Sequence, residues 1–144
     1  MSQENFIGPG HPFYKATLRG DQAIPHLIMD EEGGMMTADR AAQRLGVKQS
    51  ELEQMRQAGK ILSVEAYGER RYPVWQLDDE GQLLEGVAEV TTALSHLDDW
   101  MKVSWMLGGD DFFGGNSPLN VLREAKGNPE VITSLVRRAK IAFE

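Results

Sequence analysis

The hydrophobic positions between residues 37 and 59 recur with the spacing of two short helices. They are Ala41, Ala42, Leu45, Val47, Leu52 and Met55. Thr37 is a good N-cap residue for the first helix, and Gly46 ends that helix abruptly. We expect the second helix to begin near Lys48 or Gln49 and to end at Gly59. Two short helices around a tight turn containing glycine are the pattern of a helix-turn-helix.

After residue 59 the period of the apolar positions changes to two, which is typical of a strand. Leu62 and Val64 alternate with polar residues, a turn follows at residues 67–69, and a second strand is predicted over residues 70–77. Pro73 cannot donate a backbone hydrogen bond, so we expect it on an edge or beyond the paired part. A hairpin directly after the second helix predicts a wing.

From residue 86 onward the pattern is helical. One amphipathic stripe consists of Val87, Val90, Ala93, Leu94 and Leu97. Asp98 is the predicted cap of the next helix, and a glycine-rich break covers residues 108–115. The aromatic residues of this half are expected in the core: Trp100, Trp105, Phe112 and Phe113.

Two clear helix starts lie near the C-terminus. Ser117-Pro118 and Asn128-Pro129 each place an N-cap residue before a proline at the first helical position. They predict one helix that ends near residue 127 and a last helix that runs to the C-terminus.

The whole pattern predicts a mainly α fold with one small β-hairpin. We expect an N-terminal arm with a short helix near Pro25 in residues 1–36, followed by a winged helix-turn-helix in residues 37–77. A helical bundle is expected over residues 86–144.

The charge distribution bears on what the winged part can bind. The chain has 144 residues, no cysteine and a formal net charge of -7. The absence of cysteine excludes disulfides, thiolate zinc sites and cysteine nucleophiles. The net charge argues against strong non-specific binding to nucleic acid, but residues 37–77 hold seven basic and five acidic side chains and are the only net-positive third. We therefore expect modest DNA affinity per copy and a homodimer that places two recognition helices roughly 34 Å apart.

We predict no enzyme activity, no metal and no cofactor. His11, His26 and His96 lack the spacing of metal ligands, and Asp110-Asp111 lacks the flanking ligands of a cation loop. The glycine pairs in residues 108–115 do not match a phosphate-binding loop. No apolar run is long enough for a bilayer and the first residues do not resemble a signal peptide, so we expect no membrane contact and a cytoplasmic location.

The second helix of a helix-turn-helix meets base edges with its N-terminal part. The candidate DNA-binding residues are Lys48, Gln49, Ser50, Gln54 and Gln57 on this helix, with Arg70 and Arg71 on the wing. Glutamine pairs with adenine, and lysine reaches guanine or phosphate. The alternative is the solvated face of a protein-interaction module, because Glu51 and Glu53 would repel phosphates. For either arginine the alternative is a surface salt bridge with Glu65 or Glu69.

Several segments resemble the winged helix-turn-helix of the MerR/excisionase kind. They are Ala41-Ala42, Leu45-Gly46-Val47, Leu52, Gly59-Lys60 and Arg70-Arg71-Tyr72-Pro73-Val74-Trp75-Gln76. The resemblance covers about forty residues, and the wing ending is its more specific part. It implies binding to double-stranded operator DNA.

The half that begins near residue 86 resembles the Xre/MbcA/ParS-type toxin-binding domain. The resemblance is carried by Trp100, the run Phe113-Gly114-Gly115-Asn116-Ser117-Pro118-Leu119, Leu122, Val131, Leu135 and Val136. It implies a cognate protein toxin as partner, often a RES-domain enzyme that acts on NAD. The residues it implies for toxin binding are Phe113, Gly114, Gly115, Ser117, Pro118, Leu119 and Phe143.

Together the two resemblances predict the antitoxin of a bacterial type II toxin–antitoxin system. Such a protein neutralises its toxin and regulates its own operon by binding DNA. Two alternatives stay open. One is a stand-alone or prophage-type transcription regulator, and the other is an interaction module that has lost DNA binding.

Overall fold

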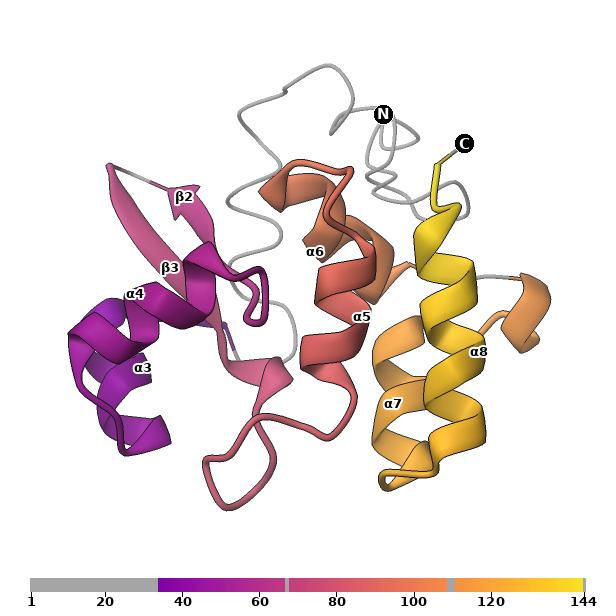
Figure 1. Cartoon of the computed structure of the whole chain (residues 1–144), viewed down its shortest axis with the longest axis horizontal. Coiled ribbons are helices and arrows are strands. Elements are labelled where there is room, and N and C mark those ends of the chain that lie inside the picture. The colour runs from indigo at the N-terminus through magenta and orange to yellow at the C-terminus, as the bar shows by residue number, and fades with distance from the viewer. Residues whose placement is uncertain (1–33, 67, 109–110, 144) are drawn as a thin grey trace.

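The computed structural model describes residues 34–66, 68–108 and 111–143, and the predicted helix near Pro25 lies outside these ranges. The described chain is mainly helical, with a small three-stranded antiparallel sheet. Figure 1 shows the two short helices α3 and α4 beside the sheet at one end of the molecule, and helices α5 to α8 gathered at the other. The predicted mainly α fold with a small hairpin is confirmed.

The helix-turn-helix consists of α3 (Ala38–Leu45) and α4 (Gln49–Gln57). The Thr37 hydroxyl accepts a hydrogen bond from the backbone N–H of Arg40 at 3.3 Å, as an N-cap should. Gly46 ends α3 with φ at 72°, a left-handed conformation that glycine adopts without a Cβ clash. Both predicted boundaries of this helix are confirmed.

The sheet contains one strand more than the predicted hairpin. Its strands are β1 (Met35–Thr37), β2 (Val64–Ala66) and β3 (Glu69–Pro73), in the order β1-β3-β2. Assigning Met35 and Met36 to an N-terminal arm was wrong, because they pair with Pro73 and Tyr72. A strand of three residues is too short to show an alternating pattern. Leu62 was also placed wrongly, since β2 begins only at Val64.

Pro73 is the last residue of the central strand. It lies opposite Met35 of β1, whereas β2 pairs only with residues 69–71 of β3. Pro73 is therefore beyond the part paired with β2, although it does not lie on an edge strand. The chain then turns into the 3-10 helix η3 (Val74–Gln76), where a continuing strand was predicted. A proline cannot donate to the ladder, which favours the end of the strand at this point.

The C-terminal half holds α5 (Val87–Ala93), α6 (Asp99–Leu107), η4 (Asp111–Phe113), α7 (Pro118–Ala125) and α8 (Pro129–Lys140). The three predicted N-caps are confirmed, because Asp98, Ser117 and Asn128 each accept a backbone hydrogen bond from the first turn of the following helix. Helix α5 ends at Ala93, before the predicted stripe does. None of the helices in the described ranges is long and apolar enough to cross a membrane.

Two cores meet at the sheet. The smaller core joins α3, α4 and the sheet and consists of Met36, Ala41, Ala42, Leu52, Ile61, Tyr72 and Leu77. In the larger core, Leu62, Val64 and Trp75 pack with the buried residues of α5 to α8. The hairpin thus shares its side chains with both halves. Apolar burial on this scale fixes the helix-turn-helix against the helical half.

Gln76 links the end of the wing to the segment before β2. Its side chain is fully buried, its Oε1 accepts from the backbone N–H of Leu62 at 2.8 Å, and its Nε2 donates to the Leu62 carbonyl at 2.8 Å. The side-chain amide thereby forms the two hydrogen bonds that a neighbouring strand would otherwise form with the Leu62 backbone. This pairing explains how residues 61–63 stay buried outside any strand.

Candidate nucleic-acid interface

Helix α4 presents a polar, exposed face. All five predicted DNA-binding residues of this segment are exposed: Lys48, Gln49, Ser50, Gln54 and Gln57. Leu52 anchors the opposite face and is 1% exposed. Lys48 stands at the N-cap position, so the ammonium group and the first amides of α4 lie together at the start of the helix. In helix-turn-helix proteins that bind DNA, the corresponding part of the second helix meets base edges in the major groove.

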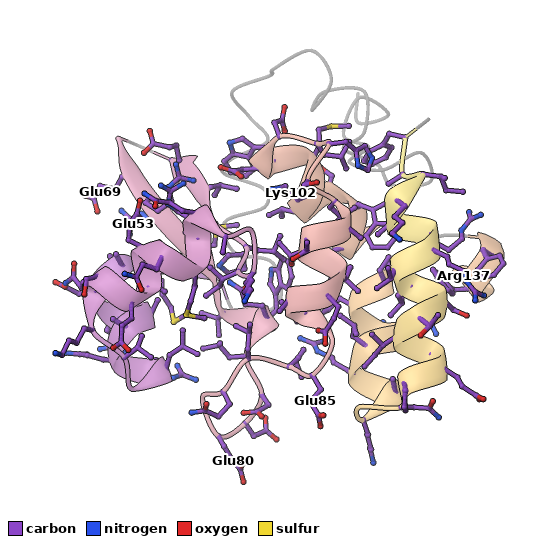
Figure 2. All side chains as sticks on the ribbon, viewed as in Figure 1. Glu53, Glu69, Glu80, Glu85, Lys102 and Arg137 are labelled. Carbon is purple, nitrogen blue, oxygen red and sulfur yellow. The ribbon has the colours of Figure 1, made fainter. Side chains whose placement is uncertain are left out.

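The two carboxylates that would repel phosphates are engaged within the helix. Glu51 accepts a hydrogen bond from the backbone N–H of Lys48 at 2.8 Å. Glu53 accepts two hydrogen bonds from the guanidinium of Arg56, one of them 2.9 Å from Nε, and a third from Gln57 at 3.1 Å. Figure 2 shows Glu53 on the side of α4 nearest the hairpin. Pairing with Arg56 cancels most of the repulsion expected from Glu53.

The same hydrogen bonds lower the pKa of Glu53 from its ordinary value of 4.5 to about 2, with the bond from Arg56 as the main cause. Because the folded pKa lies below the unfolded one, this pairing stabilises the fold fully above pH 4.5 and is lost as the pH falls toward 2. We expect Glu53→Gln to be less stable than the wild type near neutral pH, with a difference that shrinks below pH 4.5. Urea unfolding at a series of pH values measures this difference. A difference independent of pH would contradict the assignment.

Some side chains on the exposed face of α4 bond to other residues of the chain, and others do not. Gln49 donates to the carboxylate of Asp39 on α3, and Gln57 donates to Glu53. Lys48, Ser50 and Gln54 make no side-chain hydrogen bond or ion pair with the rest of the described chain. These three residues are therefore the strongest candidates for contacts to DNA. Arg40 and Arg44 on α3 and Lys60 after α4 are also exposed.

The wing arginines are turned toward the protein. Arg70 donates through Nη1 to Asp99 of α6 at 2.8 Å and to the Ser63 hydroxyl at 3.2 Å. Arg71 lies 3.6 Å from Glu69, which is the alternative that the sequence left open for it. The two side chains are only 25% and 22% exposed. Arg70 thus ties β3 to α6, whereas Arg71 pairs within β3 itself. The partner of Arg70 was not predicted, because Asp99 is 29 positions away in the sequence.

The predicted toxin-binding residues do not form one exposed surface. Pro118 and Leu119 are buried, and Ser117 caps α7. Phe113 and Phe143 are half-buried and pack against the larger core. Of this set, only Gly114 and Gly115 are exposed, both with positive φ.

The prediction that Phe112 lies in the core is wrong. It is 59% exposed, its ring packs edge-on against Phe113 at 5.0 Å, and the guanidinium of Arg138 lies 4.6 Å from its centroid. The cation–π contact holds the ring at the surface. Over residues 34–66, 68–108 and 111–143, no group of three or more His, Asp or Glu side chains could hold a metal ion.

Comparisons with known proteins bear on the fold. No known protein family matches the chain, and no curated protein matches it in sequence. The fold is similar to that of Rv2175c, which was solved by NMR, with a TM-score of 0.60 at 21% sequence identity. The similarity covers 77% of this chain and 82% of Rv2175c. The similarity supports the mainly helical fold with a small antiparallel sheet described for this chain.

Proposed function

We propose that the protein is a DNA-binding transcription regulator that reads double-stranded DNA with α4. The observation that carries this proposal is the exposed set Lys48, Ser50 and Gln54 on the second helix of a helix-turn-helix. An ammonium, a hydroxyl and a carboxamide are suited to phosphate and base edges in the major groove. The pairing of Glu53 with Arg56 supports the same proposal, because it weakens the strongest objection to it. A regulator of this kind acts by binding DNA in the cytoplasm.

The affinity of one copy for DNA should be modest. The chain carries a net charge of -7, and its wing arginines are paired with Asp99 and Glu69. Few cations are then left to displace counterions from the phosphates. A homodimer would double the number of base contacts and compensate for the weak field.

Changing Lys48 tests the role of the helix start. We expect Lys48→Ala to weaken binding to DNA of any sequence and to reduce the slope of log K against log salt by about 1. Lys126→Ala is the matched control, since Lys126 is an exposed lysine after α7 and should leave the slope unchanged. Fluorescence anisotropy with a labelled duplex measures both. Equal slopes for the two variants would show that Lys48 does not contact DNA.

A second proposal is that the helical half neutralises a cognate toxin, as the resemblance of that half implies. The exposed stretch formed by Phe112, Gly114 and Gly115 favours a protein contact there, whereas the burial of Pro118 and Leu119 limits that contact to the loop before α7. Co-expression with the product of the adjacent reading frame, RES-domain or otherwise, tests it. A neighbour that is harmless alone, or lethal despite this protein, rules the proposal out.

A further inference from the structure

An ion pair joins the wing to the helical half of the chain. Arg70 of β3 donates through Nη1 to Oδ2 of Asp99 at 2.8 Å, and Asp99 is the first residue of α6. Figure 1 shows α6 beginning on the side nearest the hairpin. The same Nη1 donates to the Ser63 hydroxyl at 3.2 Å. A carboxylate of the helical half therefore determines where a cation of the wing lies.

Charges from three elements surround this pair. Nζ of Lys102, one turn further along α6, lies 4.0 Å from Oδ1 of Asp99. Glu53 of α4 has its pKa lowered to about 2, mainly by the hydrogen bond from Arg56 and to a smaller extent by the charge of Arg70. Arg70 thus acts electrostatically on the recognition helix while it is bonded to the helical half.

Arg70 can change partner at a small cost. The side chains of Arg70 and Asp99 are 25% and 42% exposed, so water screens their attraction, and ion pairs of this kind contribute little to stability. The planar guanidinium suits phosphate oxygens as well as a carboxylate. Arg70 also follows Gly68 in the turn of the hairpin by two positions. A released guanidinium there would be within reach of a DNA backbone that lies against the wing.

We propose that Asp99 withholds Arg70 from DNA, so that the helical half limits the DNA affinity of the winged half. This inference rests on the proposed function, because it needs a duplex bound along α4 and the wing. Asp99 acts through Arg70 and makes no contact with DNA itself, so it is a positioning residue. Loss of the Asp99 carboxylate frees one cation of the wing to displace a counterion from the phosphates.

Removing the Asp99 carboxylate from the full chain tests this role. We expect Asp99→Ala to bind a fluorescein-labelled duplex of random sequence about threefold to tenfold more tightly at low salt. The slope of log K against log salt should steepen by about 0.9, which corresponds to one added phosphate contact. Fluorescence anisotropy over a series of potassium chloride concentrations measures both quantities. In an Arg70→Ala background the same substitution should leave the slope unchanged, because no Arg70 side chain is then released.

Glu65→Ala is the matched control. Glu65 is exposed and lies opposite Arg70 in the register of β2 and β3, but none of the ion pairs in the described ranges involves it. Its removal changes the charge beside Arg70 without breaking the pair with Asp99, so the slope should equal that of the wild type. Thermal melts identify any variant that has lost its fold.

Two kinds of failure can be told apart. Weaker binding or an unchanged slope for Asp99→Ala overturns the inference and leaves DNA binding by α4 in place. A steeper slope that persists in the Arg70→Ala background overturns it as well, because the added phosphate contact would then come from another cation. If neither the wild type nor any variant binds the duplex at low salt, the proposed function fails and the inference fails with it.

Discussion

Replacing Gln76 with leucine is expected to lower the free energy of unfolding by about 3 to 5 kcal/mol. Leucine has about the volume of glutamine, and an apolar side chain suits a buried site. It cannot form hydrogen bonds, however, so both the N–H and the C=O of Leu62 lose their partners. Leu62 is 1% exposed, so water cannot replace the two 2.8 Å hydrogen bonds. Urea unfolding measures the loss.

Gln76→Glu should be nearly as damaging, because a carboxylate accepts from the Leu62 N–H but cannot donate to the Leu62 carbonyl. Gln82→Leu is the control, since Gln82 is exposed and should change the stability by less than about 0.5 kcal/mol. A loss below about 1 kcal/mol for Gln76→Leu would mean that the Gln76 amide does not support the wing.

Gly86→Ala is expected to cost about 2 to 4 kcal/mol in stability. Gly86 precedes α5 with φ at 97°, and a Cβ there would lie 2.7 Å from Leu122 Cδ2 and 2.9 Å from Ile132 Cγ1. The alanine would thus combine backbone strain with overpacking against α7 and α8. Thermal or urea unfolding measures the effect.

The matched control for Gly86→Ala is Gly59→Ala. Gly59 also has a positive φ, at 74°, but a Cβ there would meet nothing within 4 Å. Only the backbone strain of about 1 to 2 kcal/mol applies at that position. Equal losses for the two variants would show that α5 does not approach α7 and α8 as closely as described.

The elements that the sequence predicted correctly are those whose signals are local. Thr37, Ser117 and Asn128 mark helix starts because an N-cap side chain bonds to a backbone N–H two or three residues later. Gly46 marks a helix end because its left-handed φ is a property of that residue alone. The helix-turn-helix and the starts of the last two helices therefore follow from neighbouring residues, although α8 ends at Lys140 and does not run to the C-terminus as predicted.

The elements that were missed depend on contacts between distant residues. Strand β1 exists because Met35 and Met36 pair with β3, and three residues carry no periodic signal. The sequence pattern predicts a strand at Gln76, because it does not reveal that the Gln76 amide bonds Leu62, 14 positions earlier. For the candidate site, the exposed face of α4 was predictable from helix spacing. The ion pair between Arg70 and Asp99 could not be predicted, because no local sequence pattern indicates it.

Selection from a random double-stranded DNA library tests the central claim, that α4 reads base sequence. We expect the wild-type chain to enrich one short motif, arranged as two half-sites if the protein binds as a dimer. Gln54→Ala should lose the preference at one base pair of each half-site, at a cost of about 1 to 3 kcal/mol for the preferred base, while Gln82→Ala selects the wild-type motif. No enrichment at low salt, or an unchanged motif with Gln54→Ala, would contradict the claim.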